Sequence, residues 1–362
     1  MEMPCLQVHV EPEKGWINDP NGLIYYNGRY HAFYQHYPHA PHWGPMHWGH
    51  AVSRDLLHWE ELPMALTPDQ PYEDLYGCFS GSAMEKDSKL WVVYTAVSKE
   101  QGQTQCLAVS EDGVTFTKYP GNPVIARSPV DPENRDFRDP KVFPLGEGYG
   151  LVVGAGAEGL ASVLLFRSPD LIRWDYVGPL FETRDMGPVC ECPDFFPLGE
   201  QWVLCFSRMD NGRVQFITGA FDGERFAPET FSQPEVGPDF YAAQTFLAPD
   251  GRRLCLGWMY NWKRQVPEDA VRAGALTLPR EVSLRGGKVV LAPVAEAAAL
   301  LREEDPCVVR EGGFLRVTDG KNTLLEVPAE SVTRVQVLAD GHAREVFLNS
   351  GETVCTFYLE NS

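Results

Sequence analysis

A short motif that recurs at a nearly constant interval constrains the fold of this chain more than any other feature. The motif is a serine, any residue, an aspartate and, four residues later, an aromatic residue. Clear copies begin at Ser53, Ser110 and Ser168, 57 and 58 residues apart, and a weaker copy runs from Ala220 to Phe226. Regular self-similarity at such a period is typical of propellers and other repeat architectures. We therefore expect similar units rather than one irregular core.

The segments between the motif copies have the pattern of antiparallel strands. Apolar runs such as Leu90–Thr95 and Trp202–Phe206 are short and rich in β-branched and aromatic residues. An aspartate followed by glycine or by a short polar stretch closes a hairpin before each aromatic residue of the motif. Each repeat is thus expected to hold several strands, and helical periodicity is nearly absent.

A second series of segments interleaves with the first and carries polar residues at the start of each unit. The openings are spaced by roughly 50 to 60 residues, a period that suits about four strands per unit. They are Asn18–Gly22, Phe79–Ser82, Phe137–Pro140, Glu191–Asp194 and Asp239–Gln244. Any one of them could be a polar turn, but five in regular order predict an all-β, five-bladed propeller whose opening strands line the central axis.

The pattern changes after about Pro279, where short strands between turns replace the repeats. We expect a catalytic propeller over residues 1–285 and a small β-sandwich over residues 286–362. The alanine-rich stretch Ala295–Glu304 is the best candidate for a helix, because alanine has the highest helix propensity.

Charge and cysteine content exclude several classes of protein. A net charge of −19 argues against a nucleic-acid partner, which needs a basic face, and gives no attraction to anionic membranes. The nine cysteines include Cys5, are odd in number and form no CxxC pair, which favours reduced thiols in the cytoplasm. The segment Met1–Val10 lacks the pattern of a signal peptide, and no apolar run is long enough for a membrane span.

Three acidic residues stand in the opening segments: Asp19, Asp139 and Glu191. Hydrolysis of a glycosidic bond uses two carboxyl groups, one of which protonates the leaving oxygen while the other attacks or activates water. The apolar stretch Val189–Pro193 is expected to keep Glu191 protonated, whereas amide neighbours are expected to hold Asp19 ionised. Arg138 is expected to keep Asp139 charged, so that Asp139 can bind sugar hydroxyls.

The same segments resemble a known family. Gly15–Gly22 looks like the signature of glycoside hydrolase family 32, the group of invertases, inulinases, levanases and sucrose-6-phosphate hydrolases, and Phe137–Pro140 and Glu191–Pro193 resemble its second and third motifs. The resemblance continues, in order, in Trp48–Ser53, Phe79–Ser82, Asp239–Gln244, Gly257–Met259 and Leu278–Glu281. It covers roughly residues 9 to 285.

The resemblance implies a five-bladed propeller with a C-terminal β-sandwich, and a retaining β-fructofuranosidase that needs no cofactor or metal. Asp19 would be the nucleophile, Glu191 the acid/base and Asp139 the transition-state stabiliser, with the first two carboxyls about 5 Å apart. The implied fructose contacts are Asn18, Gln35, Trp43, Phe79, Ser80, Arg138, Tyr241 and Gln244. Trp43 could instead be a core residue at a blade edge.

Several alternatives stay open. The C-terminal segment is shorter than the family's usual sandwich, which puts any oligomer contact or substrate site there in doubt. A fructosyltransferase or a non-catalytic sugar-binding propeller would share the fold, and an inverting furanosidase would separate its carboxyls by about 6.5 to 9.5 Å. Sucrose, sucrose 6-phosphate and short fructo-oligosaccharides all fit as substrates. Cys190 and Cys192 flank Glu191 and are expected to form an apolar wall.

Overall fold

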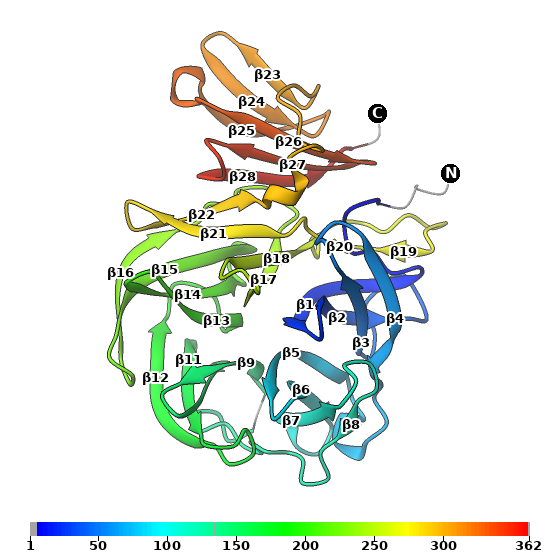
Figure 1. The fold of residues 1–362 in the computed structure, drawn as a ribbon, viewed down its shortest axis with the longest axis vertical. Helices are drawn as coiled ribbons and strands as arrows, with labels where there is room; N and C mark the ends of the chain where they lie inside the picture. The colour runs from blue at the N-terminus through cyan, green and yellow to red at the C-terminus, as the bar shows by residue number, and fades with distance from the viewer. Residues whose placement is uncertain (1–5, 134, 361–362) are drawn as a thin grey trace.

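The chain forms a ring of five sheets with two further sheets on one side of the ring (Figure 1). The computed structural model describes residues 6–133 and 135–360. Its sheets confirm the prediction of a five-bladed β-propeller followed by a β-sandwich. In each blade the innermost strand comes first in the sequence and its neighbours follow outward in an antiparallel meander.

The five blades share this order, and their strands have the following bounds. Blade 1 contains β1 (Gly15–Tyr26), β2 (Arg29–Tyr37), β3 (His47–Ser53) and β4 (Trp59–Leu66). Blade 2 contains β5 (Gly77–Lys86), β6 (Lys89–Ser98), β7 (Gly102–Ser110) and β8 (Thr117–Lys118). Blade 3 contains β9 (Phe137–Leu145), β10 (Gly148–Ala157), β11 (Leu160–Ser168) and β12 (Asp175–Thr183). Blade 4 contains β13 (Cys190–Leu198), β14 (Gln201–Arg208), β15 (Arg213–Phe221) and β16 (Phe226–Ser232). Blade 5 contains β17 (Tyr241–Leu247), β18 (Arg253–Met259), β20 (Ala275–Leu276), β21 (Arg280–Arg285) and β22 (Lys288–Pro293).

The ring is closed where blade 5 meets blade 1. The short strand β19 (Arg272–Ala273) pairs in parallel with β1, and Val10 forms a bridge with Leu276 of β20. The first and last parts of the propeller segment therefore hold each other through backbone hydrogen bonds. Closure of this kind joins the first blade to the last, and the strand edges that remain on the axis are short and protected by the neighbouring blades.

The recurring serine-aspartate motif forms the turn between the third and fourth strands of a blade. In blade 3, the Ser168 hydroxyl accepts hydrogen bonds from the N–H groups of Asp170 and Leu171 at 3.1 and 2.8 Å. Asp170 Oδ1 accepts those of Ile172 and Arg173 at 3.0 and 2.9 Å. The matching turns of blades 1 and 2 use the same bonds. The repeat in the sequence is thus a repeat of turn chemistry.

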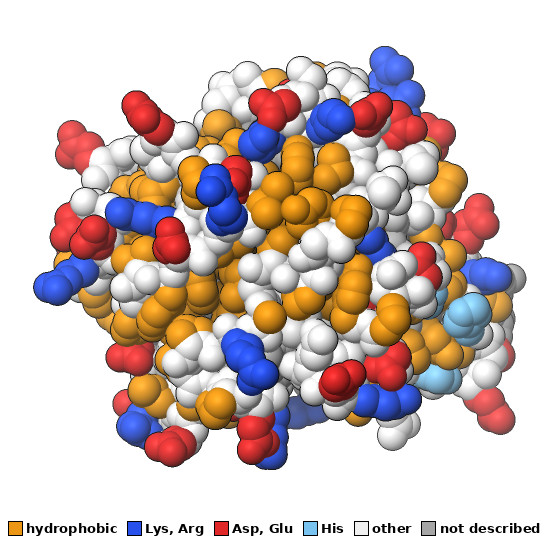
Figure 2. Space-filling model, turned by 90° about the horizontal axis from the view of Figure 1, so that it is seen from below, with side chains coloured by type: hydrophobic (Ala, Val, Ile, Leu, Met, Phe, Trp, Pro, Cys, Tyr) orange, Lys and Arg blue, Asp and Glu red, His pale blue; other side chains and the backbone are white. Residues whose placement is uncertain are grey.

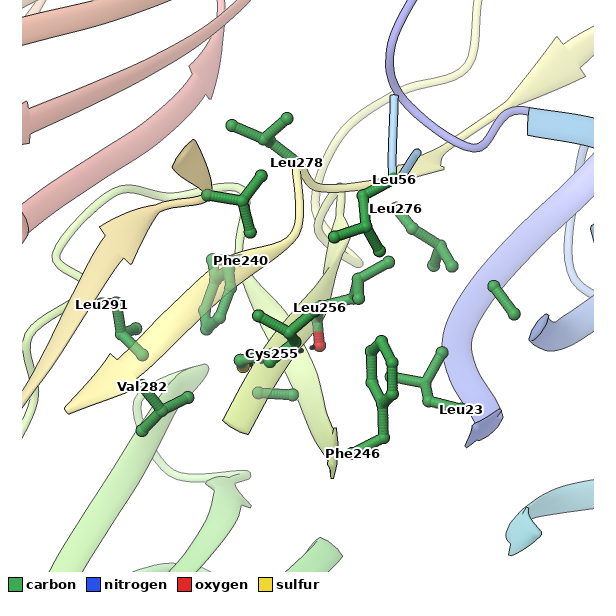
Figure 3. Close-up of a cluster of buried hydrophobic side chains, with 14 of the residues drawn as sticks. Leu23, Leu56, Phe240, Phe246, Cys255, Leu256, Leu276, Leu278, Val282 and Leu291 are labelled. Carbon is green, nitrogen blue, oxygen red and sulfur yellow. Dashed lines mark hydrogen bonds between the residues drawn. The ribbon is translucent and has the colours of Figure 1, made fainter. Parts of the chain in front are cut away.

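Buried apolar side chains fill the spaces between neighbouring blades, and the largest such cluster joins blades 4, 5 and 1 to the sandwich. Figure 3 shows its centre, where Phe246 and Leu256 of blade 5 face Leu23 of blade 1. Phe347 and Val354 of the sandwich belong to the same cluster. Burial of this surface, at about 25 cal/mol per Å², is what holds the blades in a ring.

The predicted boundary at residue 285 is wrong by one strand. Arg285 pairs with Lys288 across a tight turn of Gly286 and Gly287, both at positive φ, so β21 and β22 form one hairpin. That hairpin completes blade 5, and the propeller therefore extends to Pro293.

The predicted helix at Ala295–Glu304 is also wrong. Only the 3₁₀ turn η2 (Ala295–Ala297) forms there, because Arg302 is drawn into two backbone hydrogen bonds with Val337 of the sandwich. The other 3₁₀ turns of the described chain are η1 (Pro71–Glu73) and η3 (Ala329–Ser331).

The sandwich is two three-stranded sheets that pack around an apolar core containing Leu315, Val337 and Phe357. Its first sheet contains β23 (Val308–Glu311), β24 (Phe314–Thr318) and β25 (Thr323–Pro328). Its second contains β26 (Val335–Asp340), β27 (Ala343–Leu348) and β28 (Thr353–Tyr358).

On the edge of the propeller opposite the sandwich, basic and acidic side chains are interspersed around apolar ones, with no continuous basic surface on that face (Figure 2). The eight described cysteines are free and buried, while Cys5 lies outside the described residues. None of the helical turns in the described chain has the length and apolar character that a transmembrane helix requires.

A buried charge network ties the sandwich to the propeller. The fully buried Arg280 of β21 donates to Glu235 at 2.7 Å and to Glu345 of β27 at 2.6 Å. His9 lies between two sandwich carboxylates, with Nδ1 2.8 Å from Asp340 and Nε2 2.9 Å from Glu345. Both ring nitrogens face acceptors, so the imidazole must be protonated to satisfy them. Burial alone would lower the pKa of His9, but the two carboxylates raise it to about 9.

We predict that His9 makes the stability of this interface depend on pH. Because its folded pKa lies above the usual 6.5, its contribution is complete below about pH 6.5 and is lost as the pH rises through 9. Thermal unfolding between pH 6 and 10 should show a decline that is smaller in His9→Gln, a difference worth at most about 3 kcal/mol. The exposed His39 supplies the control His39→Gln, which should follow the wild type. Identical pH curves for wild type and His9→Gln would contradict the prediction.

Candidate active site

Each innermost strand carries a one-residue β-bulge at the same depth of the propeller. In every blade, three steps along the inner strand are paired with only two steps along its neighbour. The bulges lie between Ile17 and Pro20, Cys78 and Gly81, Arg138 and Lys141, Glu191 and Asp194, and Tyr241 and Gln244. A bulge interrupts the alternation of side chains and re-aims them, and bulges occur next to active sites for that reason.

The bulges also interlock neighbouring blades. In blades 3, 4 and 5, the residue that directly follows Arg138, Glu191 or Tyr241 in the bulge has a positive φ. These residues are Asp139 (68°), Cys192 (47°) and Ala242 (53°). Each of their N–H groups donates to a side chain of the preceding blade. Asp139 donates to Thr95 at 3.0 Å, Cys192 to Asp139 at 2.8 Å, and Ala242 to Ser207 at 2.8 Å. The left-handed conformation is costly for a residue with a Cβ, by about 1–2 kcal/mol, and the neighbouring blade maintains it.

Asp19 lies in the bulge of β1 and is held by three donors. Its Oδ2 accepts hydrogen bonds from the Ser80 hydroxyl at 2.6 Å and from the Cys192 thiol at 3.3 Å, and its Oδ1 accepts one from the Asn18 amide at 3.0 Å. Burial raises the pKa of Asp19, the hydrogen bonds from Ser80 and Asn18 counteract that rise, and the charge of Glu191 adds to it. The expected amide donor is present, but the net shift of this pKa is upward rather than downward.

Glu191, in the bulge of β13, lies in polar rather than apolar surroundings. Its Oε1 accepts a hydrogen bond from Arg138 at 3.0 Å and its Oε2 accepts one from the Tyr241 hydroxyl at 2.6 Å. The expectation of an apolar pocket fails because Cys190 packs into the core between blades, while Cys192 faces Asp19. Two donors from the neighbouring blades thus fix the orientation of this carboxyl group.

Asp139 is fully buried, and Arg138 does not hold it in the way expected. The Arg138 guanidinium donates instead to Asp136 at 2.8 Å and to Glu191. Burial raises the pKa of Asp139 to about 7, with the charge of Arg138 acting against the rise and the charges of Asp19 and Glu191 adding to it. Low dielectric and the two neighbouring carboxylate charges thus favour the protonated form of Asp139.

The three acids line one cavity of about 430 Å³ at the centre of the ring. Nine of the residues expected in the site face it: Asn18, Asp19, Gln35, Trp43, Phe79, Ser80, Arg138, Asp139 and Glu191. Trp43 contacts the rings of Tyr76 and Phe79, so it is a wall of the cavity as well as part of an aromatic cluster. Of the other two expected contacts, Tyr241 lines an adjoining cavity and Gln244 is buried beneath the site.

Three residues that line the cavity were not expected from the sequence: Gln103, Tyr76 and Trp262. Gln103 lies on β7 and accepts a hydrogen bond from the N–H of Phe137 at 2.7 Å, but in the sequence it is one polar residue in an ordinary strand. Trp262 follows the Gly257–Met259 motif, is 56% exposed and stacks on Trp16 at 5.7 Å. A tryptophan three residues after a recognised motif is the sequence signal that could have found it.

A second cavity of about 660 Å³ adjoins the first and shares Glu191 and Trp262 with it. Its remaining walls come from the connection after β14, from residues before β17 and from the segment after β18, including Arg213 and Lys263. Glu191 therefore stands at the border of two connected spaces. In the described part of the chain, no group of three or more histidine, cysteine or acidic residues is arranged to hold a metal ion.

Comparison with known proteins shows the family to which the chain is related. The family model described as the N-terminal domain of glycosyl hydrolases family 32 matches residues 9–293, which end at the last residue of blade 5. A sucrose-6-phosphate hydrolase of Zymomonas mobilis is 41% identical over 329 residues and 82% of this chain, and a raffinose invertase of Escherichia coli is 39% identical over 98% of the chain. The chain spans 63% of the length of the first and 76% of the second.

Solved structures agree with the fold. A GH32 β-fructofuranosidase of Bombyx mori, solved as a mutant in complex with sucrose, superposes with a TM-score of 0.86 at 30% identity. The superposition covers 99% of this chain and 89% of that one. An exo-inulinase of Aspergillus awamori superposes with a TM-score of 0.81 at 26% identity and covers 99% and 93% of the two chains.

Proposed function

The chain belongs to glycosyl hydrolase family 32, and on this premise we propose that it is a retaining β-fructofuranosidase that releases terminal fructose from β-D-fructofuranosides. The observation that carries the proposal is the convergence of Asp19 and Glu191 on one cavity from blades 1 and 4. Their partners differ, since Asp19 is held by short hydroxyl and amide donors and Glu191 by a phenol and a guanidinium. Two carboxyls with separate roles are what glycoside hydrolysis requires.

In the first step, Asp19 attacks C2 of the bound fructose while Glu191 protonates the leaving oxygen. The buried Asp19 is kept available as a carboxylate by the donors Ser80 and Asn18. Glu191 lies where the two cavities meet, which is also where the bond between fructose and leaving group must lie. The proton moves from the Glu191 carboxyl to the leaving oxygen as the C2–O bond breaks.

In the second step, water attacks C2 of the fructosyl-enzyme and loses a proton to Glu191, while the bond between C2 and the Asp19 oxygen breaks and releases the Asp19 carboxylate. Tyr241 and Arg138 keep the Glu191 carboxyl in one orientation through both steps. Asp139 is buried beside the other two acids, and in its carboxylate form it can accept a hydrogen bond from a fructose hydroxyl and stabilise the positive charge that develops on the ring. Retention follows from two displacements at the same carbon.

We predict that Glu191→Gln and Asp19→Asn each reduce fructose release from sucrose by at least about 10³-fold. The loss in Glu191→Gln should be smaller for an aryl fructofuranoside, because its leaving group needs no proton, whereas Asp19→Asn should be equally impaired on both substrates. The kinetics of fructose release and the anomer first seen by NMR measure these effects.

The same assay separates the alternatives. Kestose-type products that dominate at high sucrose would indicate a fructosyltransferase, and an inverted first product would indicate a single displacement. A wild-type protein that binds sucrose without any turnover would be a sugar-binding propeller and would disprove the proposal.

The hydrogen bond from Ser80 to Asp19 predicts a change in the pH profile. The bond favours the ionised nucleophile, so its loss in Ser80→Ala raises the pKa of Asp19 further above its usual value. The acid limb of kcat/KM should move to higher pH by about one unit, the equivalent of about 1.4 kcal/mol. Ser168→Ala, in an outer turn of blade 3, is the control and should leave the limb in place. An unmoved limb in Ser80→Ala would show that this bond does not tune the nucleophile.

A specific observation favours sucrose 6-phosphate over sucrose as the substrate. The cavity on the leaving-group side of Glu191 is lined by Arg213 and Lys263, and neither has a carboxylate partner among the described residues. Among the described residues, the Arg213 guanidinium makes one hydrogen bond, to the carbonyl of Gly237 at 3.4 Å. Two unneutralised cations facing one pocket suit a phosphate group, and a relative from Zymomonas mobilis is a sucrose-6-phosphate hydrolase.

We predict that Arg213→Gln and Lys263→Gln each lower kcat/KM on sucrose 6-phosphate about tenfold, or 1.4 kcal/mol, and change kcat/KM on sucrose by less than about threefold. The surface variant Lys99→Gln is the charge-matched control. Equal losses on both substrates, or a wild type without preference for the phosphate, would rule out a phosphate site here.

A further inference from the structure

Beneath the catalytic cavity, three polar side chains from neighbouring blades form a second layer on the propeller axis. In blades 3, 4 and 5, Lys141, Asp194 and Gln244 are the residues at which regular strand pairing resumes after the bulge. Lys141 Nζ lies 3.1 Å from Asp194 Oδ2 and donates to Gln244 Oε1 at 3.1 Å and to the carbonyl of Thr245 at 2.5 Å. All three side chains are buried, and we call them the lower layer.

Burial of the charged and polar side chains of the lower layer costs free energy. A buried ion pair rarely stabilises a fold more than apolar residues of the same size would, because both charges lose their water. Asp194 Oδ2 lies 3.1 Å from Lys141 Nζ and also accepts the N–H of Thr245 at 2.6 Å, whereas the buried Oδ1 of Asp194 has no hydrogen-bond partner among the described residues. What the layer supplies is a fixed arrangement of polar atoms directly below the acids.

Cys192 connects this layer to all three acids. Its carbonyl accepts a hydrogen bond from Gln244 Nε2 at 3.4 Å. Its N–H donates to Asp139 at 2.8 Å, its thiol donates to Asp19 at 3.3 Å, and it directly follows Glu191 in the chain. A movement of this one residue would therefore move or release every acid of the site.

The backbone of Cys192 does not hold this geometry unaided. Its φ of 47° lies in the left-handed region, which a residue with a Cβ avoids unless its surroundings impose it. The bond from Gln244 restrains the carbonyl side of this residue, and Lys141 in turn fixes the oxygen of the Gln244 amide, so that the nitrogen faces Cys192.

We propose that Lys141 and Gln244 are positioning residues that hold Cys192 in its left-handed conformation and thereby set the placement of Asp19, Asp139 and Glu191. This inference rests on the proposed hydrolase function and replaces the expectation that Gln244 contacts fructose. A positioning role affects the chemical step and the ionisation of the acids, whereas a contact role affects substrate binding.

The test is the kinetics of Gln244→Met, which keeps the side-chain volume but removes both hydrogen bonds. We expect kcat on sucrose to fall 10- to 100-fold with KM changed less than twofold, and the acid limb of kcat/KM to move to higher pH because the donors on Asp19 and Asp139 are loosened. Gln215→Met is the matched control, since Gln215 is an equally buried glutamine of blade 4 that bonds only to the carbonyls of Phe216 and Ser232. It should leave kcat and the pH profile unchanged.

Two further variants cover the case in which Gln244→Met does not fold. Gln244→Glu keeps an oxygen for Lys141 but has no donor for the Cys192 carbonyl, and should show the same loss of kcat. The double variant Lys141→Met/Asp194→Leu removes the ion pair without leaving a lone buried charge and should lower kcat in the same way.

The outcomes separate this inference from the proposed function. A raised KM with unchanged kcat in Gln244→Met would make Gln244 a substrate contact and overturn the positioning role. Folded variants with wild-type kcat and pH profile would also overturn it. A wild-type protein that releases no fructose would instead refute the hydrolase function itself.

Discussion

The one-residue bulge in each innermost strand is the constraint on which the site depends. A regular strand would direct successive side chains to opposite faces, so that a residue and its neighbour could not both face the cavity on the propeller axis. The extra residue breaks this alternation at the same depth in all five blades, and there Asp19, Asp139 and Glu191 converge from segments far apart in sequence. The N–H groups that the bulge releases from the ladder bond to side chains of the preceding blade. Catalytic geometry and blade-to-blade assembly are therefore one structural feature.

Three acids gathered in this way repel one another, and the structure shows how the repulsion is limited. Arg138 is directed to Asp136 and Glu191, which leaves Asp139 to be stabilised by a backbone N–H. Burial raises the pKa of Asp19 and of Asp139, so these two carboxyls retain a proton more readily than exposed carboxyls would.

The sequence was sufficient to predict the blades and the acids, because each opening segment places polar residues where an inner strand should be apolar. The sequence was insufficient where the strand register decides whether a side chain faces the cavity. Gln35 and Gln244 look alike as polar residues near the axis, yet one lines the cavity and the other lies beneath it. A shift of one residue reverses the face of a strand, and bulges leave no clear mark in composition. Gln103 was missed because a single polar residue in a strand carries no signal, and the boundary at residue 285 because a hairpin of blade 5 resembles one of a sandwich.

The two cavities are formed by different parts of the fold. The residues proposed for the chemical step are therefore separate from those that would determine substrate specificity. The fructose side is formed largely by inner strands whose side chains are fixed by hydrogen bonds between blades. The second cavity, the proposed leaving-group side, is formed largely by connections such as Met209–Gly212 and Tyr260–Lys263, which meet Trp262 and Tyr241 around Glu191. Connections tolerate substitution and insertion far better than strands packed in a ring. A family can therefore change the group it cleaves from fructose by changing these connections, while the bulges and the acids they position stay in place.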